Sequence, residues 1–368
     1  AVVVADPSNG EILGMASYPT FNLNDPRKLT GMYTDEEIKD MSDEEYRNNL
    51  YSLWTNYCVS ESYEPGSTFK PVTVASALEE GVVKDGDTYV CKGFETVADY
   101  KLKCHVFSTI GSHGSLTVEQ ALMNSCNPYM IHLALEMGNS RFAYYQSLFG
   151  FGKITGIDLP GETTGIVYGD RMTTIDAACN SFGQTINVNM MQMMAAYCSI
   201  INGGMLYQPH IVKRIESANG EVVKEYKANL VRQTITASTS KLLRRYLKNT
   251  VEEGTAKKAG VTGYSVAGKT GTAQKGDRKD NKWIISFIGH APAENPKFAI
   301  YVVIDEPYGT TGTSGSSADV LTLTHNILEK LLPYMNVYKD ASDEYEDTSS
   351  SPDELTVDGI PAGTASSN

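Results

Sequence analysis

The feature that most constrains the fold is the position of the strand-like runs, which lie at the two ends of the chain. Residues 1–6 and 11–17 flank an Asn-Gly pair that is typical of a tight hairpin turn. Three more runs cover residues 264–274, 282–289 and 297–304. Strand and helix patterns do not alternate, so we expect an antiparallel five-stranded sheet. Its first two strands come from the N-terminus and its last three from the C-terminus.

Helical patterns fill the middle of the chain and follow the last strand. They cover residues 34–47, 67–80, 116–126, 127–137, 141–149, 187–201, 236–253 and 318–332. We therefore predict an α/β chain of the α+β type, with a sheet lobe from about 1–20 and 255–338. An all-helical lobe with insertions, from about 21–254, interrupts it, and residues 82–115 are expected to be a mixed stretch with short strands. A cleft is expected at the boundary between the lobes.

Composition and charge restrict the class of protein. The 368 residues are 41% hydrophobic, which is enough for a sizeable core. The net charge of −13 argues against a nucleic-acid partner. From Asp340 onward there are eight acidic residues and no basic ones, so residues 339–368 are predicted to be a disordered acidic tail. Residues 1–338 then form the folded domain.

The first residues, Ala-Val-Val-Val-Ala, start directly as a buried strand, and no leader is visible. No apolar run approaches the roughly 18 residues of a membrane helix. We therefore expect a soluble piece excised or processed from a longer protein.

The most informative motif is Glu64-Pro65-Gly66-Ser67-Thr68-Phe69-Lys70-Pro71. Ser67 is expected at the start of a buried helix, with Lys70 one turn later on the same face. A half-buried lysine can lose its proton and then serve as a base for the serine hydroxyl. Taken alone, the spacing also fits an N-cap serine followed by a solvated lysine.

Two further motifs favour the catalytic interpretation. Ser125-Cys126-Asn127 lies in an apolar helical region, and Lys269-Thr270-Gly271-Thr272 begins a strand. The ordered set S-x-x-K, S-x-N and K-T-G is the signature of penicillin-binding proteins and serine β-lactamases.

From residue 1 to about 332 the chain resembles the class B penicillin-binding proteins, and most of all their division and sporulation transpeptidases. The stretches that carry this resemblance, besides the three motifs, are Asp6-Pro7-Ser8-Asn9-Gly10-Glu11, Asp158-Leu159-Pro160-Gly161-Glu162, Ser181-Phe182-Gly183-Gln184 and Val251-Glu252-Glu253-Gly254-Thr255.

The resemblance implies a penicillin-binding, serine β-lactamase-like fold and a D,D-transpeptidase that cross-links peptidoglycan stem peptides and is acylated by β-lactams. It implies no cofactor for catalysis. The expected partners are stem peptides, a lipid-linked precursor, β-lactams and a membrane glycosyltransferase. The expected location is the extracytoplasmic face of the bacterial membrane, reached through an anchor outside this chain.

Roles in catalysis follow from the motifs and the resemblance. Ser67 is the expected nucleophile, and neutral Lys70 is the expected base. Ser125 would relay a proton to the leaving amine, and Asn127 would hold the substrate amide and Lys70.

The K-T-G strand completes the expected site. Lys269 and Thr270 would bind the donor carboxylate, while Gly271 would let the strand backbone approach the ligand. The resemblance assigns the oxyanion donors to the backbone N–H groups of Ser67 and Thr272.

A metal site is a separate expectation. Cys91, Asp99, Cys104 and His105 lie within fifteen residues, and zinc binds Cys, His and Asp in tetrahedral sets. We expect structural zinc on these four residues, with His113 ranked below His105 as a ligand. A Cys91–Cys104 disulfide and two unlinked thiols remain alternatives. Cys126 is expected to be a packed residue.

Two other functions fit parts of the pattern. A serine β-lactamase needs a residue that activates a deacylating water, and Glu162 is the residue that the sequence offers. A non-catalytic β-lactam sensor would be acylated once, but such domains lack the early hairpin with its long excursion.

Overall fold

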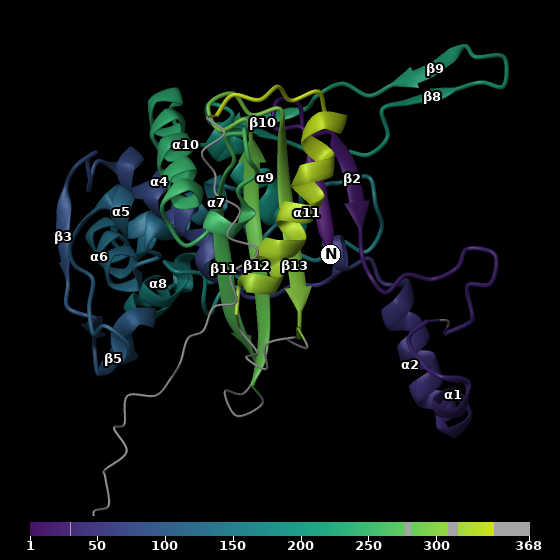
Figure 1. The fold of residues 1–368 in the computed structure, drawn as a ribbon, viewed down its shortest axis with the longest axis horizontal. Coiled ribbons are helices and arrows are strands. Elements are labelled where there is room, and N and C mark those ends of the chain that lie inside the picture. Colours follow the sequence, from purple (N-terminus) through teal and green to yellow (C-terminus); the bar gives the residue numbers. More distant parts are fainter. Residues whose placement is uncertain (30, 277–280, 308–315, 342–368) are drawn as a thin grey trace, which may run out of the picture.

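The computed structural model describes residues 1–29, 31–276, 281–307 and 316–341. Its centre is a five-stranded antiparallel sheet in the order β11-β12-β13-β1-β2, as the sequence predicted (Figure 1). The strands are β1 (Val2–Ala5), β2 (Ile12–Ala16), β11 (Ala267–Lys275), β12 (Lys282–Ala291) and β13 (Phe298–Asp305). β1 therefore pairs with a strand from the far end of the chain, and β11 lies at one edge.

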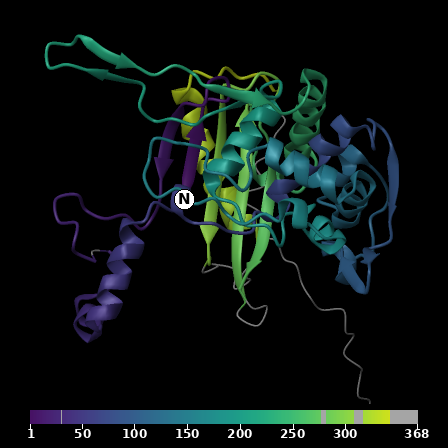
Figure 2. The same cartoon turned by 180° about the vertical axis from the view of Figure 1, so that it is seen from behind.

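Alternating side chains of the strands supply two cores on opposite faces of the sheet. In β13, Tyr301 and Val303 face the helical lobe, whereas Ile300 and Val302 pack with α11 (Ala318–Tyr334). α11 lies in front of the sheet in Figure 1, and α9 (Met190–Ile201) lies in front in Figure 2. The methionine-rich α9 is buried along its whole length, so its apolar side chains are core.

The helical lobe lies beside β11. Its α-helices are α3 (Tyr57–Ser60), α4 (Lys70–Glu80), α5 (Val118–Met123), α6 (Asn127–Met137), α7 (Asn139–Leu148), α8 (Thr174–Asn180), α9 and α10 (Ala237–Glu252). It holds the predicted helices with shifted ends, together with two short helices that were not predicted, α3 and α8. The short 3₁₀ turns are η1 (Gly66–Phe69), η2 (His105–Ser108), η3 (Gly169–Arg171) and η4 (Lys257–Ala259).

The expectation that this lobe is all-helical is wrong. The structure describes four two-stranded sheets within it, and the two within residues 88–117 lie where short strands were expected. They pair β3 (Thr88–Cys91) with β6 (Gly114–Thr117), β4 (Phe94–Val97) with β5 (Tyr100–Lys103), β7 (Met205–Tyr207) with β10 (Leu230–Gln233), and β8 (Arg214–Glu216) with β9 (Val222–Glu225).

Two segments project from the body. The β8–β9 hairpin forms one arm, and the helices α1 (Asp35–Asp40) and α2 (Asp43–Trp54) form another (Figures 1 and 2). The second arm has a small core of its own, built on Leu29, Leu50 and Leu53. These arms correspond to surface excursions of the chain, away from the sheet.

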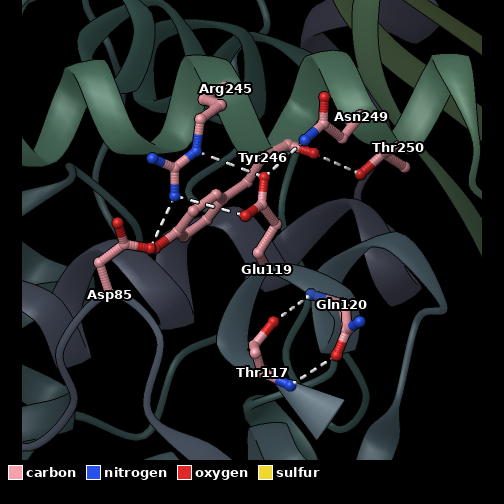
Figure 3. A network of polar contacts seen from close by, with 8 residues as sticks. All are labelled: Asp85, Thr117, Glu119, Gln120, Arg245, Tyr246, Asn249 and Thr250. Atoms are coloured by element: carbon pink, nitrogen blue, oxygen red, sulfur yellow. Dashed lines mark hydrogen bonds and ion pairs between the residues drawn. The ribbon is translucent and has the colours of Figure 1, made fainter.

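A polar network fixes α10 against the rest of the helical lobe (Figure 3). Arg245 contacts Asp85 at 2.6 Å and Glu119 of α5 at 3.3 Å. The hydroxyl of the buried Tyr246 donates to Asp85 at 2.8 Å, and Asn249 donates to Glu119 at 2.6 Å. α10 thereby connects the segment after α4 with α5.

The start of the predicted tail contacts the body. Asp340 accepts a 2.7 Å hydrogen bond from the backbone N–H of Ser265. The rest of the tail, residues 342–368, lies outside the described residues. Across the described part of the chain, none of the helices has the length and apolarity needed to cross a membrane.

Candidate active site

Ser67 lies in the 3₁₀ turn η1, immediately before α4 begins at Lys70. The backbone N–H of Lys70 donates to the carbonyl of Ser67, which closes this turn. A 3₁₀ turn has three residues per turn, so residues i and i+3 eclipse each other. The predicted face shared by Ser67 and Lys70 is therefore present, although Ser67 precedes the α-helix instead of capping it.

Lys70 is fully buried and is held by the S-x-N segment. Its Nζ donates to the carbonyl of Ser125 at 2.6 Å, to Ser125 Oγ at 3.0 Å and to Asn127 Oδ1 at 2.7 Å. Ser125 Oγ lies 3.0 Å from Ser67 Oγ. The three side chains thus form a continuous chain from the Ser67 hydroxyl through the Ser125 hydroxyl to the lysine amine.

The segment that carries Ser125 has a strained backbone. Ser125 has φ of 53°, in the left-handed region that non-glycine residues seldom occupy. Asn127 begins α6, with Pro128 in the first turn of that helix. The strain therefore lies at the residue whose carbonyl and hydroxyl both contact Lys70.

Burial controls the charge of Lys70. Loss of hydration lowers the pKa of its amine to about 8, against an opposing effect of the thiols of Cys126 and Cys104. A substantial fraction of the amine is neutral near physiological pH. Lys70 can therefore accept a proton while its hydrogen-bond partners hold it in place.

Lys269 supplies a second buried amine. It lies on β11 and is fully buried, and burial followed by the charge of Lys70 lowers its pKa well below the usual value. Its Nζ has long contacts to Thr255 Oγ1 at 3.5 Å and to Thr270 Oγ1 at 3.4 Å. Within the described residues no carboxylate pairs with it, so the position favours an anionic ligand.

Glycines bring β11 against the turn that carries Ser67. A Cβ on Gly66 would lie 2.5 Å from the carbonyl oxygen of Thr272. A Cβ on Gly271 would lie 2.8 Å from the carbonyl oxygen of Pro65 and 2.5 Å from Ser286 Oγ. The missing side chain of Gly271 therefore makes room for η1, which is a reason for glycine that the sequence did not show.

Three cysteines and one histidine form a cluster that includes Cys126, the middle residue of the S-x-N motif. The ligand atoms of Cys91, Cys104, His113 and Cys126 all lie within 4.8 Å of one another. His113 Nδ1 is 3.7 Å from Cys91 Sγ and 3.6 Å from Cys104 Sγ. The Cys104 sulfur accepts a hydrogen bond from the Cys126 thiol, which lowers the pKa of Cys104 and raises that of Cys126.

The structure brings together two of the four residues expected as metal ligands, Cys91 and Cys104, and places the other two outside the cluster. The β4–β5 hairpin joins Cys91 and Cys104 at its base but carries Asp99 to its tip, roughly 13 Å of strand away. His105 Nε2 lies 2.9 Å from the carbonyl of Asn124. His113 and Cys126 take the places expected for these two residues. Cys91 and Cys104 are both free cysteines, so the Cys91–Cys104 disulfide is not formed.

Comparison with known families agrees with this geometry. The family described as the penicillin binding protein transpeptidase domain matches residues 1–329. The chain belongs to this family. The resemblance read from the three motifs is therefore confirmed, as is the prediction of a transpeptidase domain with an antiparallel five-stranded sheet and flanking helices.

Individual relatives of this transpeptidase domain include proteins named for sporulation and for peptidoglycan synthesis. It is 39% identical over 341 residues to stage V sporulation protein D of Bacillus subtilis, covering 91% of this chain and 49% of that protein. It is 31% identical to the peptidoglycan D,D-transpeptidase FtsI of Escherichia coli K12, covering 93% of this chain and 52% of FtsI. The chain spans about half the length of these relatives.

Solved structures show the same fold. Penicillin-binding protein 3 of Mycobacterium tuberculosis, crystallised with aztreonam, superposes with a TM-score of 0.77 at 28% identity, over 93% of this chain and 74% of that one. The D,D-transpeptidase domain of a peptidoglycan glycosyltransferase from Eggerthella lenta gives the same TM-score and identity, over 91% and 78%.

Proposed function

We propose that this transpeptidase domain cross-links peptidoglycan stem peptides through an acyl-enzyme on Ser67, and that β-lactams acylate the same hydroxyl. The observation that carries the proposal is the hydrogen-bonded series of Ser67, Ser125 and Lys70 beside the buried amine of Lys269, with which no carboxylate of the described residues pairs. A nucleophile with a base and an anion site next to it is what acyl transfer from a peptide with a free carboxylate requires.

Acylation begins when Ser67 Oγ attacks the carbonyl between the last two D-alanines of the donor. Its proton passes to Ser125 Oγ, whose own proton moves to neutral Lys70, so Lys70 is the final acceptor. No direct hydrogen bond between Lys70 and Ser67 is present among the described contacts, which favours this relay. When the C–N bond breaks, Lys70 returns the proton through Ser125 Oγ to the leaving amine, and D-alanine departs.

The K-T-G strand orients the donor and stabilises the charge that develops on it. Lys269 and Thr270 bind the terminal carboxylate by charge-assisted hydrogen bonds. The backbone N–H groups of Ser67 and Thr272 form the oxyanion hole, since Thr272 lies next to Gly66. Asn127 holds Lys70 and the donor amide. An amine of a second stem peptide then attacks the ester and releases Ser67.

The structure offers little support for a β-lactamase. Glu162 accepts hydrogen bonds from the N–H and hydroxyl of Thr155 on one oxygen and from the N–H of Gly156 on the other. Both oxygens are used to hold a loop, so Glu162 is not a free base for a water. We propose slow hydrolysis of β-lactam esters.

The remaining expectations concern the longer protein to which the chain would belong. We propose that residues 1–338 form one transpeptidase domain on the outer face of the bacterial membrane, anchored by a segment outside this chain. A lipid-linked precursor and a membrane glycosyltransferase would be its partners. The stage V sporulation relative supports a role in sporulation, and the FtsI relative supports one in division.

We also propose a structural zinc ion on Cys91, Cys104, His113 and Cys126. Tetrahedral zinc with its usual bond lengths would separate a sulfur ligand from a nitrogen ligand by about 3.5 Å. The observed separations of 3.6 and 3.7 Å fit this value. Cys126 lies between Ser125 and Asn127, so an ion here would brace both residues that hold Lys70.

Metal analysis of protein prepared without chelator tests the zinc site. We expect one zinc per chain, and less than half of that in Cys91→Ser. Cys179→Ser, which changes a cysteine outside the cluster, serves as the control and should keep the metal. Absence of zinc from the unmodified protein would remove the proposal, as would equal zinc contents of both variants.

Two measurements test the transpeptidase itself. Intact mass after exposure to benzylpenicillin should rise by the mass of one antibiotic in the unmodified chain and stay constant in Ser67→Ala. D-Alanine release from a stem-peptide mimic separates the enzyme from a sensor, which would be acylated without turning over the peptide. An unmodified mass after prolonged exposure would overturn the assignment.

A further inference from the structure

A cavity of about 430 Å³ lies at the end of β11 that is farther from Lys269. It is lined by residues 57 and 61–64 before the catalytic turn, by residues 184, 185 and 187, by residues 273–276 at the end of β11, and by Ile284 of β12 and Asp305 of β13. Ala273 and Glu64 lie within three residues of Thr272 and Ser67. The cavity therefore adjoins the catalytic centre, although none of the catalytic side chains lines it.

The free edge of β11 determines which part of a donor peptide reaches this cavity. β11 pairs only with β12, so its other edge can accept an extended peptide as an added strand. With its carboxylate at Lys269 and its scissile carbonyl at Thr272, the peptide must run antiparallel to β11. Strand residues advance by about 3.4 Å, so the residue before the acyl D-alanine lies beside Ala273 and Gln274. Its side chain can then enter the cavity.

The charges of the cavity are unbalanced. Its lining holds three carboxylates, on Glu61, Glu64 and Asp305, and one ammonium, on Lys275. Lys275 Nζ contacts Asp305 and Glu306, each at 2.9 Å. Neither Glu61 nor Glu64 forms an ion pair with any residue that the structure describes. The cavity thus has two carboxylates in excess of its cation.

Glu64 is the better placed of these two groups. It is partly buried and accepts a 2.8 Å hydrogen bond from the backbone N–H of Thr185, which leaves its other oxygen available. Burial raises the pKa of its carboxyl, because no cation compensates for the lost hydration. An ammonium in the cavity would supply that compensation.

We propose that this cavity is a specificity pocket for the side-chain ammonium of the third residue of the donor stem peptide, recognised by Glu64 with Glu61. The inference rests on the proposed transpeptidase function, because it takes the direction of the peptide from the carboxylate site. Selection of a free amine has a chemical use here. A donor whose amine is already acylated by a cross-link would be disfavoured.

The test compares two synthetic donors that end in D-Ala-D-Ala, one with a free amine on its third residue and one with that amine acetylated. The readout is kcat/KM for D-alanine release. We expect the unmodified domain to prefer the free amine by about tenfold, the effect of one hydrogen bond between charged groups. Glu64→Gln keeps an acceptor for Thr185 and should reduce the preference to near unity. Glu225→Gln, on the projecting β9 strand, should retain it.

The outcomes separate the pocket from the function on which it rests. If penicillin acylates Ser67 but both donors react equally well in the unmodified domain, the pocket inference fails and the transpeptidase stands. Retention of the full preference in Glu64→Gln also overturns it. If penicillin does not acylate Ser67, the proposed function itself fails. Third residues of lysine and of diaminopimelate should both be accepted, since each has the ammonium.

Discussion

Replacing Gly271 by alanine should damage acylation without touching any catalytic side chain. The added Cβ would lie 2.5 Å from Ser286 Oγ, 2.8 Å from the Pro65 carbonyl oxygen and 2.9 Å from Thr68 Cγ2. Carbon atoms pack at about 3.5–4.0 Å, so β11 and η1 would have to separate by several tenths of an ångström or more. Both oxyanion donors lie on these two elements.

The magnitude follows from that separation. Overpacking of a rigid contact costs about 1–3 kcal/mol of stability. A misplacement near 1 Å can cost about 100-fold in rate, so we expect acylation by a fluorescent penicillin to slow by about 10- to 100-fold. Ser286→Ala in the same chain removes only the closest contact, so it should restore part of the rate. The carbonyl of Pro65 belongs to the backbone and cannot move aside as easily.

The control is Gly14→Ala, in β2 of the same sheet. A Cβ at Gly14 would meet only Val4 Cβ, at 4.0 Å, which is an ordinary contact. This variant should be acylated at the rate of the unmodified domain. The reasoning is refuted if Gly271→Ala, folded by circular dichroism, has an unchanged second-order acylation constant.

Three further predictions concern the base, the relay and the helix network. The acylation rate should rise with pH through about 8, because burial lowers the pKa of Lys70 and only its neutral form accepts a proton; a flat profile between pH 6 and 9 would contradict this. Ser125→Ala should slow acylation by about 100-fold or more if the relay operates, and a rate within threefold of normal would exclude it. Tyr246→Phe should lower the free energy of unfolding in urea by about 1 kcal/mol through loss of the bond to Asp85, whereas the exposed Tyr144→Phe should change it little.

The sequence allowed the sheet and the shared face of Ser67 and Lys70 to be predicted because both depend on local patterns, whereas the approach of Ser125 was expected from the family signature. The strand periods and the hairpin turn define the sheet, and helical spacing brings Ser67 and Lys70 to one face. The 3₁₀ geometry of the Ser67 turn could not be read in this way, since Pro71 fits the start of a helix in either register. The pairs β7–β10 and β8–β9 were not predicted, because strands of three or four residues show no clear period.

The cluster of Cys91, Cys104, His113 and Cys126 shows the limit of proximity in the sequence as a guide to contacts. Asp99 is near Cys91 in the chain but is carried away by its hairpin, while His113 arrives through the pairing of Cys91 with Gly114 in the β3–β6 sheet. Cys126 comes from the start of α6, more than twenty residues after Cys104. Pairing register and helix position decide these contacts, and neither was available from the sequence. The position of Cys126 between Ser125 and Asn127 is the feature of the sequence that indicates its place in the cluster.

The central place of β1 in the sheet has a consequence for biosynthesis. Ala1 and Val303 exchange backbone hydrogen bonds of 2.8 and 2.9 Å, so β1 can pair early with β2 but meets its other partner, β13, only after residues 298–305 have been synthesised. Contacts this distant in sequence fold slowly and leave apolar strands exposed meanwhile. A nascent chain still attached to the ribosome and ending before β11 would already contain Ser67, yet penicillin should fail to label it.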